Sequence, residues 1–147
     1  MRRHRPPFFH PAVPRSRRDG WTVERQCLFL GHLYLTGSVA GAAAAAGMSR
    51  MSAYRLRRRP DAQGFAHAWD VVLAPPGSDK RTTPATDWRK VTLEQLQQRV
   101  ATGLVAPLVH AGRVCAIRHK PDNSALLRLL RRYDALCPPP PGEDGGA

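Results

Sequence analysis

The sequence of 147 residues contains few of the residues that disulfide frameworks, metal sites and membrane spans require. Its three cysteines, Cys27, Cys115 and Cys137, are odd in number and far apart, so neither a disulfide framework nor a zinc knuckle is expected. No apolar run approaches the length of a membrane span, and the N-terminus lacks the apolar segment of a secretory signal. We therefore expect reduced thiols, a cytoplasmic location and no membrane partner.

Acidic residues are also scarce, with 11 against 23 basic residues and a formal net charge of +12. The acids are scattered, and the six histidines show no metal-ligand spacing with a matching partner. Gly37 and Gly41 surround an alanine-rich helix rather than a strand-to-helix turn, so no phosphate-binding loop is present. We expect no enzyme, no cofactor and no metal. The excess of arginine over lysine favours bidentate contacts with phosphate or guanine, and hence a nucleic-acid partner.

The stretch from residue 38 to 59 predicts two short helices joined by a glycine turn. Ser38 is a good N-cap for a body made almost entirely of alanine, the best helix former. Gly47 can adopt the left-handed conformation that ends a helix, and Ser49 can cap the next helix. A short glycine-containing turn between two helices is typical of the helix-turn-helix motif.

The second of these helices is expected to have an apolar side and a basic side. At 100° per residue, Ser49, Ala53 and Leu56 share one side, which faces the core. The other side can enter a DNA major groove, where arginine matches guanine edges or phosphate oxygens. The expected DNA-binding residues are Ser49, Arg50, Met51, Tyr54, Arg55, Arg57, Arg58 and Arg59. The alternative is a structural helix pair whose arginines are simply solvated.

The sequence around this turn resembles the helix-turn-helix modules of bacterial regulators, transposases and phage small terminases. The resemblance covers roughly residues 21–74, and Ala53 departs from it because such modules usually carry a larger branched aliphatic residue there. It implies binding of double-stranded DNA. The residues that carry it are Gly37-Ser38-Val39, Ala42-Ala43, Gly47-Met48-Ser49 and Ser52-Ala53-Tyr54-Arg55-Leu56.

Two further helices are expected to complete this DNA-binding domain, which would span residues 21–74. A support helix should follow the Thr22 cap and run to about Thr36. A fourth helix should start after Pro60, with Asp61 as its cap, and Phe65 and Trp69 should close the core that the alanines leave thin.

The flanking segments are expected to be a disordered basic arm at 1–20, a linker at 75–90 and a disordered tail at 138–147. The arm could follow DNA phosphates or serve only as a solubilising tail. Between linker and tail, residues 91–137 predict a small α+β unit. It comprises a helix capped by Thr92, strands at 104–110 and 113–119 around Ala111-Gly112, and a last helix with Asn123 or Asp122 as its cap. The hairpin should pack on one or both flanking helices, because two strands alone are marginal.

The predicted fold class is therefore mainly α: a helix-turn-helix bundle of about four helices, then a helix–β-hairpin–helix unit, with disordered termini. The predicted function is DNA binding by a bacterial, nucleoid-associated transcriptional regulator that places helix 49–59 in the major groove. The C-terminal unit leaves a homodimer open. The alternatives are a protein of DNA recognition and assembly resembling a phage small terminase, which a ring-sized oligomer would indicate, and a nonspecific nucleic-acid binder.

Overall fold

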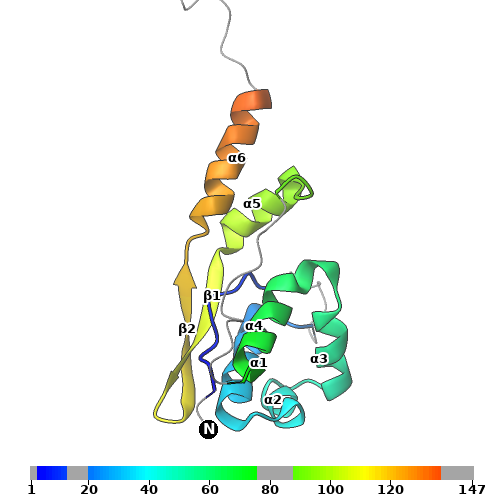
Figure 1. Cartoon of the computed structure of the whole chain (residues 1–147), viewed down its shortest axis with the longest axis vertical. Coiled ribbons are helices and arrows are strands. Elements are labelled where there is room, and N and C mark those ends of the chain that lie inside the picture. Colours follow the sequence, from blue (N-terminus) through cyan, green and yellow to red (C-terminus); the bar gives the residue numbers. More distant parts are fainter. Residues whose placement is uncertain (1–2, 13–19, 76–87, 137–147) are drawn as a thin grey trace, which may run out of the picture.

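The computed structural model describes residues 3–12, 20–75 and 88–136 (Figure 1). Within these ranges the chain is mainly helical, with a bundle around the helix-turn-helix and a helix–hairpin–helix unit after it, as the sequence predicts. The expected linker falls largely outside the described residues, and the expected C-terminal tail entirely so. The elements are α1 (Val23–Thr36), α2 (Val39–Ala45), α3 (Arg50–Arg57), the 3₁₀ helix η1 (Pro60–Ala62), α4 (Gln63–Leu73), α5 (Leu93–Thr102), β1 (Leu104–His110), β2 (Arg113–Lys120) and α6 (Asn123–Leu136).

Side-chain caps start the helices where the sequence indicates. The hydroxyls of Thr22, Ser38 and Ser49 each accept a hydrogen bond from the backbone N–H three residues on. The Thr92 hydroxyl does the same for α5, and the Gln95 side chain accepts a hydrogen bond from the Thr92 N–H, which completes a capping box. These bonds satisfy amides that have no partner within the helix, so short polar residues determine the helix starts.

The start of α4 differs from the expectation that Asp61 caps it. Residues 60–62 form the 3₁₀ turn η1, and α4 begins at Gln63 without a side-chain cap. The Asp61 carboxylate instead accepts two hydrogen bonds from the Arg59 guanidinium, with N–O distances of 2.9 and 2.5 Å. The ion pair with Arg59 therefore engages the two Asp61 oxygens that could otherwise accept hydrogen bonds from the first amides of the helix.

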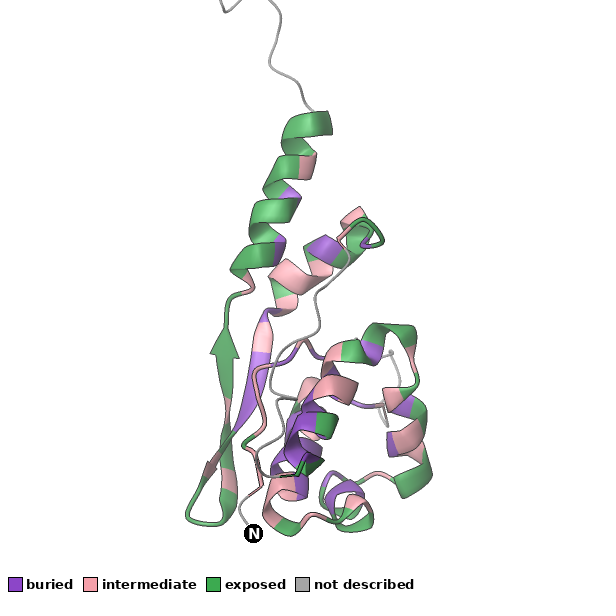
Figure 2. Ribbon diagram, viewed as in Figure 1, coloured by how far each residue is buried: buried purple, intermediate pink, exposed green. Residues whose placement is uncertain are grey.

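The core lies between α1 and α4 and beneath the α2–α3 pair (Figure 2). Phe29 of α1 contacts Phe65 and Trp69 of α4, with ring centroids 5.6 and 4.8 Å apart. All three rings are buried. Aromatic residues from α1 and α4 thus fill the space that small residues leave, as predicted. The buried alanines of the helix-turn-helix are Ala42, Ala43, Ala46 and Ala53.

The expectation of a disordered arm over residues 1–20 is wrong for residues 3–12. Phe9 is buried and forms a two-way backbone bridge with Val105 of β1, each N–H···O distance being 2.9 Å. The buried amide of Gln26 in α1 accepts from the backbone N–H of Ala12 and donates to its carbonyl, both at 2.9 Å. The arm is therefore held because apolar residues among its arginines and prolines reach the core; residues 13–19 lie outside the described part.

The β-hairpin packs on α1, which differs from the expected packing on its flanking helices. Both strands contact α1, and a Cβ added at Gly31 of α1 would lie 2.5 Å from Cγ2 of Val114. Pro107 directs its nitrogen to the same edge as Val105, away from β2, so the ladder between the strands loses no hydrogen bond. The hairpin belongs to the same body as the helix-turn-helix.

The helices α5 and α6 pack against each other around a small core of their own. It contains Val91, which precedes α5, and Leu96 of α5, together with Ala125 and Leu129 of α6. Asp122 caps α6, because its Oδ1 accepts from the Ala125 N–H at 3.1 Å. This pair extends beyond the bundle (Figure 1).

Candidate nucleic-acid interface

The turn between α2 and α3 has the geometry that a helix-turn-helix requires. Gly47 has a φ of +73°, in the left-handed region. The Met48 N–H donates to the Ala43 carbonyl at 2.9 Å and the Gly47 N–H to the Ala44 carbonyl at 3.0 Å, which is the Schellman pattern of a helix end. The glycine turn predicted from the sequence is confirmed, and it directs α3 away from the axis of α2.

The inner side of α3 fixes its seating on the bundle. Ala53 and Leu56 are buried, as their spacing predicts. Ser52 also contributes, because its Oγ accepts a hydrogen bond of 2.8 Å from the indole Nε1 of buried Trp21. Because Ala53 is small, α3 depends on large neighbours from other elements to hold its orientation.

The outer side of α3 presents cations to solvent. Arg50, Arg55 and Arg58 are exposed, and Met51 between them is 65% exposed. The Arg50 guanidinium lies 5.9 Å from the ring centroid of Tyr54, a cation–π contact. Arg55 and Arg58 make no ion pair within the described ranges. These two carry the positive charge of α3 that is most accessible to an anion.

Other side chains predicted to contact DNA are placed differently. Tyr54 was expected on the open face, but it is half-buried and its ring centroid lies 5.2 Å from that of Trp69. Arg57 lies over the same Trp69 ring at 4.7 Å, and its Nη2 forms an ion pair of 2.9 Å with Asp70. Tyr54 and Arg57 therefore help attach α3 to α4.

The ends of the predicted site are also partly engaged. The Ser49 hydroxyl accepts from the Ser52 N–H at 3.1 Å and serves as the cap of α3. The ion pair with Asp61 occupies the guanidinium of Arg59. Of the eight predicted residues, Arg50, Met51, Arg55 and Arg58 are exposed and accessible to a ligand. The side chains of the other four, Ser49, Tyr54, Arg57 and Arg59, make contacts within the protein.

The N-terminal segment contains an arginine whose role the sequence did not reveal. Arg3 donates from Nη1 to the Tyr34 carbonyl and from Nη2 to the Thr36 carbonyl, both at 3.2 Å. These carbonyls end α1 and have no partner within the helix, and a cation also interacts favourably with this end of the helix dipole. Arg3 therefore stabilises α1, and no local pattern could have indicated it because the contact spans more than 30 residues.

The two cysteines within the described ranges differ in burial. Cys27 is buried in the bundle, and this burial raises the pKa of its thiol from 9.0 to about 12. Cys115 is exposed on β2, at the irregularity in the strand pairing. A buried thiol held in its neutral form is inert toward oxidants and electrophiles at neutral pH, so Cys27 acts as an apolar core residue.

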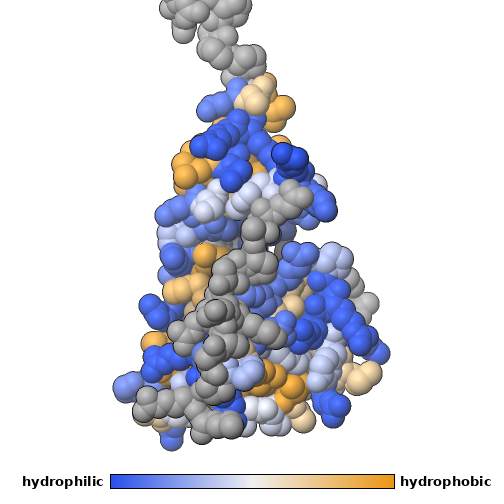
Figure 3. Space-filling view, viewed as in Figure 1, coloured by the Kyte–Doolittle hydropathy of each residue, from blue (hydrophilic) through white to orange (hydrophobic). Residues whose placement is uncertain are grey.

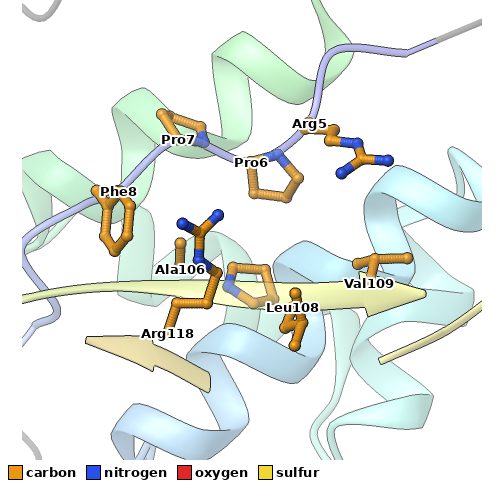
Figure 4. Close-up of a pocket in the computed structure, with 9 residues that line it drawn as sticks. Arg5, Pro6, Pro7, Phe8, Ala106, Leu108, Val109 and Arg118 are labelled. Atoms are coloured by element: carbon orange, nitrogen blue, oxygen red, sulfur yellow. The ribbon is translucent and has the colours of Figure 1, made fainter. Parts of the chain in front are cut away.

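A small pocket lies on the other side of α1, between the N-terminal segment and β1 (Figure 4). Its volume is about 120 Å³, below the range of about 300 to 1,000 Å³ that is typical of small-molecule sites. The Arg118 guanidinium at its rim already lies 5.2 Å from the Phe8 ring centroid. The pocket is lined by Arg5, Pro6, Pro7, Phe8, Ala106, Pro107, Leu108, Val109 and Arg118.

Within the described ranges, no group of three or more His, Cys, Asp or Glu residues could hold a metal ion. In the same part of the chain, no helix combines the length and the apolar character needed to cross a membrane. Comparisons with protein-family models, with curated proteins and with solved structures found no match to this chain.

Proposed function

We propose that this protein binds double-stranded DNA by placing α3 in the major groove, and that it acts as a nucleoid-associated transcriptional regulator in the cytoplasm. The observation that carries the proposal is the exposed Arg55 and Arg58 on the outer side of a helix that follows a glycine turn. Hydrophilic side chains, with paler and apolar ones among them, lie over the α3 region at the right of Figure 3. The net charge of +12 adds attraction to the phosphate backbone.

The geometry of α3 suits this role. Its exposed N-terminus favours a nearby phosphate through the helix dipole and the unpaired amides of the first turn. Arg55 and Arg58 follow on the same side at a spacing of three residues, so both can face one groove. Arg50 begins the helix and can reach the flanking backbone. The contacts of Tyr54 and Arg57 with Trp69 limit movement of the helix.

The test is selection of a preferred duplex from a random pool, followed by binding measurements on the selected and a scrambled duplex at several salt concentrations. Arg55→Ala and Arg58→Ala should each weaken binding to the selected duplex by about 1–3 kcal/mol if they contact base edges. Each lost phosphate contact should reduce the logarithmic salt slope by about 0.9. Arg113→Ala, at the exposed hairpin tip, removes the same charge and serves as the control.

The outcomes separate the candidate functions. A preference for one duplex that Arg55→Ala or Arg58→Ala relaxes supports sequence-specific recognition. Equal loss on both duplexes assigns these arginines to phosphate and favours a nonspecific binder. Wild-type affinity in both variants overturns the proposed role of α3.

A further inference from the structure

The helix α6 carries an apolar face that the described residues leave largely exposed. Five of the eight exposed large hydrophobic side chains of the described residues lie on this one helix. Leu127 is 59% exposed and Leu130 is 50% exposed, although both lie well inside the helix. Apolar patches lie over the α6 region at the top of Figure 3.

The exposed residues form a stripe, called here the α6 face: Leu126, Leu127, Leu130 and Tyr133. At its edge, the Tyr133 hydroxyl accepts a hydrogen bond of 2.6 Å from Nε2 of Gln97 in α5. Leu126, Leu130 and Tyr133 are separated by four and then three residues, the alternation of a helix that packs against another helix along a seam. Ala125 and Leu129, which contact α5, lie on the neighbouring side. The helix therefore has two adjoining apolar sides, and α5 covers only one.

Charge around the α6 face argues against an acidic or lipid partner. Arg128 stacks over Trp88 at 4.8 Å, and Arg132 donates to the Trp88 carbonyl at 2.9 Å, so both are directed to the side away from the stripe. At 100° per residue, Asp134 falls between Leu130 and Leu127 and so lies within the stripe, and Arg131 lies beside it. These two charges have opposite signs. A protein of net charge +12 thus has a nearly neutral apolar face here. An anionic membrane or acidic peptide would find only one cation, Arg131, at the rim of the stripe and would meet the Asp134 carboxylate.

The same neutrality removes the repulsion that would otherwise separate two copies of this basic chain. A second copy supplies a face of identical length and spacing, and it can place Arg131 beside the other copy's Asp134. The helix projects beyond the bundle, so two copies can meet through α6 while their α3 helices remain open (Figure 1). A helix of 14 residues is only about 21 Å long, shorter than interfaces that bury about 800 Å² per partner usually require. The pairing should therefore be weak and reversible.

We propose that the α6 face joins two copies of this protein into a dimer. The pairing follows from the described surface alone, whereas its use in binding two half-sites on one duplex rests on the proposed function. A weak dimer suits that use, because adjacent half-sites would hold both copies at a high effective concentration.

The test is sedimentation equilibrium of the full chain without DNA, over about 1 to 100 µM, the range in which a small interface associates. The wild type should shift from monomer to dimer within this range. The double variant Leu127→Glu/Leu130→Glu should raise the dissociation constant by at least about tenfold, because pairing would bury carboxylates without partners. Met51→Glu, which adds one carboxylate at an exposed apolar position on α3, should self-associate like the wild type. Far-UV circular dichroism confirms that each variant folds.

Three results would overturn the proposal. One is a wild type that remains monomeric throughout the range, and another is a dimer that the double variant leaves intact. The third is a monomer that binds vesicles containing phosphatidylserine through Leu127 and Leu130, which would assign the face to a membrane. None of these outcomes depends on DNA, so a failure of the dimer is distinguishable from a failure of the proposed DNA binding.

Discussion

Replacing Gly31 by alanine tests whether the β-hairpin lies on α1. Gly31 is in the interior of α1, where alanine normally stabilises a helix by about 0.8–1 kcal/mol relative to glycine. In this structure, however, the added Cβ would lie 2.5 Å from Cγ2 of Val114, 3.3 Å from its Cγ1 and 3.4 Å from Cβ of Pro107. Overpacking of this kind costs about 1–3 kcal/mol. The net expectation is a loss of up to about 2 kcal/mol.

Two control variants show whether a change in the free energy of unfolding for Gly31→Ala comes from contact with Val114. Gly41→Ala in α2 should stabilise the protein, because its added Cβ would meet Ser38 and Thr36 atoms only at ordinary contact distances of 3.5 to 4.0 Å. Val114→Ala removes both methyl groups that Gly31→Ala would strike. In that background Gly31→Ala should become stabilising, so the two substitutions should show a favourable coupling free energy.

The measurement is the free energy of unfolding from urea titrations followed by far-UV circular dichroism, with the slope compared among variants to check two-state behaviour. A gain in stability for Gly31→Ala that matches the gain for Gly41→Ala would refute the packing of β2 on α1. Additive effects of Gly31→Ala and Val114→Ala on the free energy of unfolding would also refute this packing.

Three further substitutions test other parts of the structure. Phe9→Ala should lower the free energy of unfolding in urea by about 3–5 kcal/mol, whereas Arg5→Ala, at an exposed position, should lower it by less than about 0.5 kcal/mol. Equal, small effects of the two substitutions would mean that the N-terminal segment does not pack against β1. Gly47→Val should lower the free energy of unfolding by about 1–2 kcal/mol through backbone strain alone, since no atom lies within 4 Å of the added Cβ. Gly47→Asn should cost less, because asparagine tolerates positive φ. An unchanged melting temperature for Gly47→Val would contradict the left-handed turn. Burial lowers the pKa of His10 below 6.5. Its contribution to stability is therefore complete above pH 6.5 and is lost as the pH falls, because the unfolded chain then binds a proton that the folded chain does not. His10→Gln should flatten the pH dependence of urea unfolding, and an unaltered pH profile in this variant would contradict the linkage.

Most helix starts and the α2–α3 turn could be predicted because their causes are local. Thr22, Ser38, Ser49 and Thr92 bond to amides three residues away, and Gly47 supplies a conformation that other residues adopt only at a cost. The spacing of apolar residues likewise predicted which side of α3 is buried. Asp61 shows where this reasoning fails, since a competing local partner, Arg59, took its carboxylate.

The candidate site was only partly predictable, because helical spacing assigns a side chain to a face but does not identify its partner. At 100° per residue, Arg57 falls 40° from buried Ala53, whereas Arg55 and Arg58 fall on the opposite side of the helix. The spacing thus places Arg57 near the core side, but it does not show that Trp69 and Asp70 of α4 hold its guanidinium. The position of α4 across α3 decides which arginines remain open for an anion.

The helices of the bundle, the glycine turn, the hairpin and the strongly basic character could be predicted from the sequence, since they follow from bonds within a few residues and from composition. Three contacts became apparent only in the folded structure: Phe9 joins β1, Gln26 holds Ala12, and the hairpin packs on α1. Those contacts join segments far apart in the chain. Each depends on the shapes and unpaired backbone groups that meet when the helices pack, which no local pattern records.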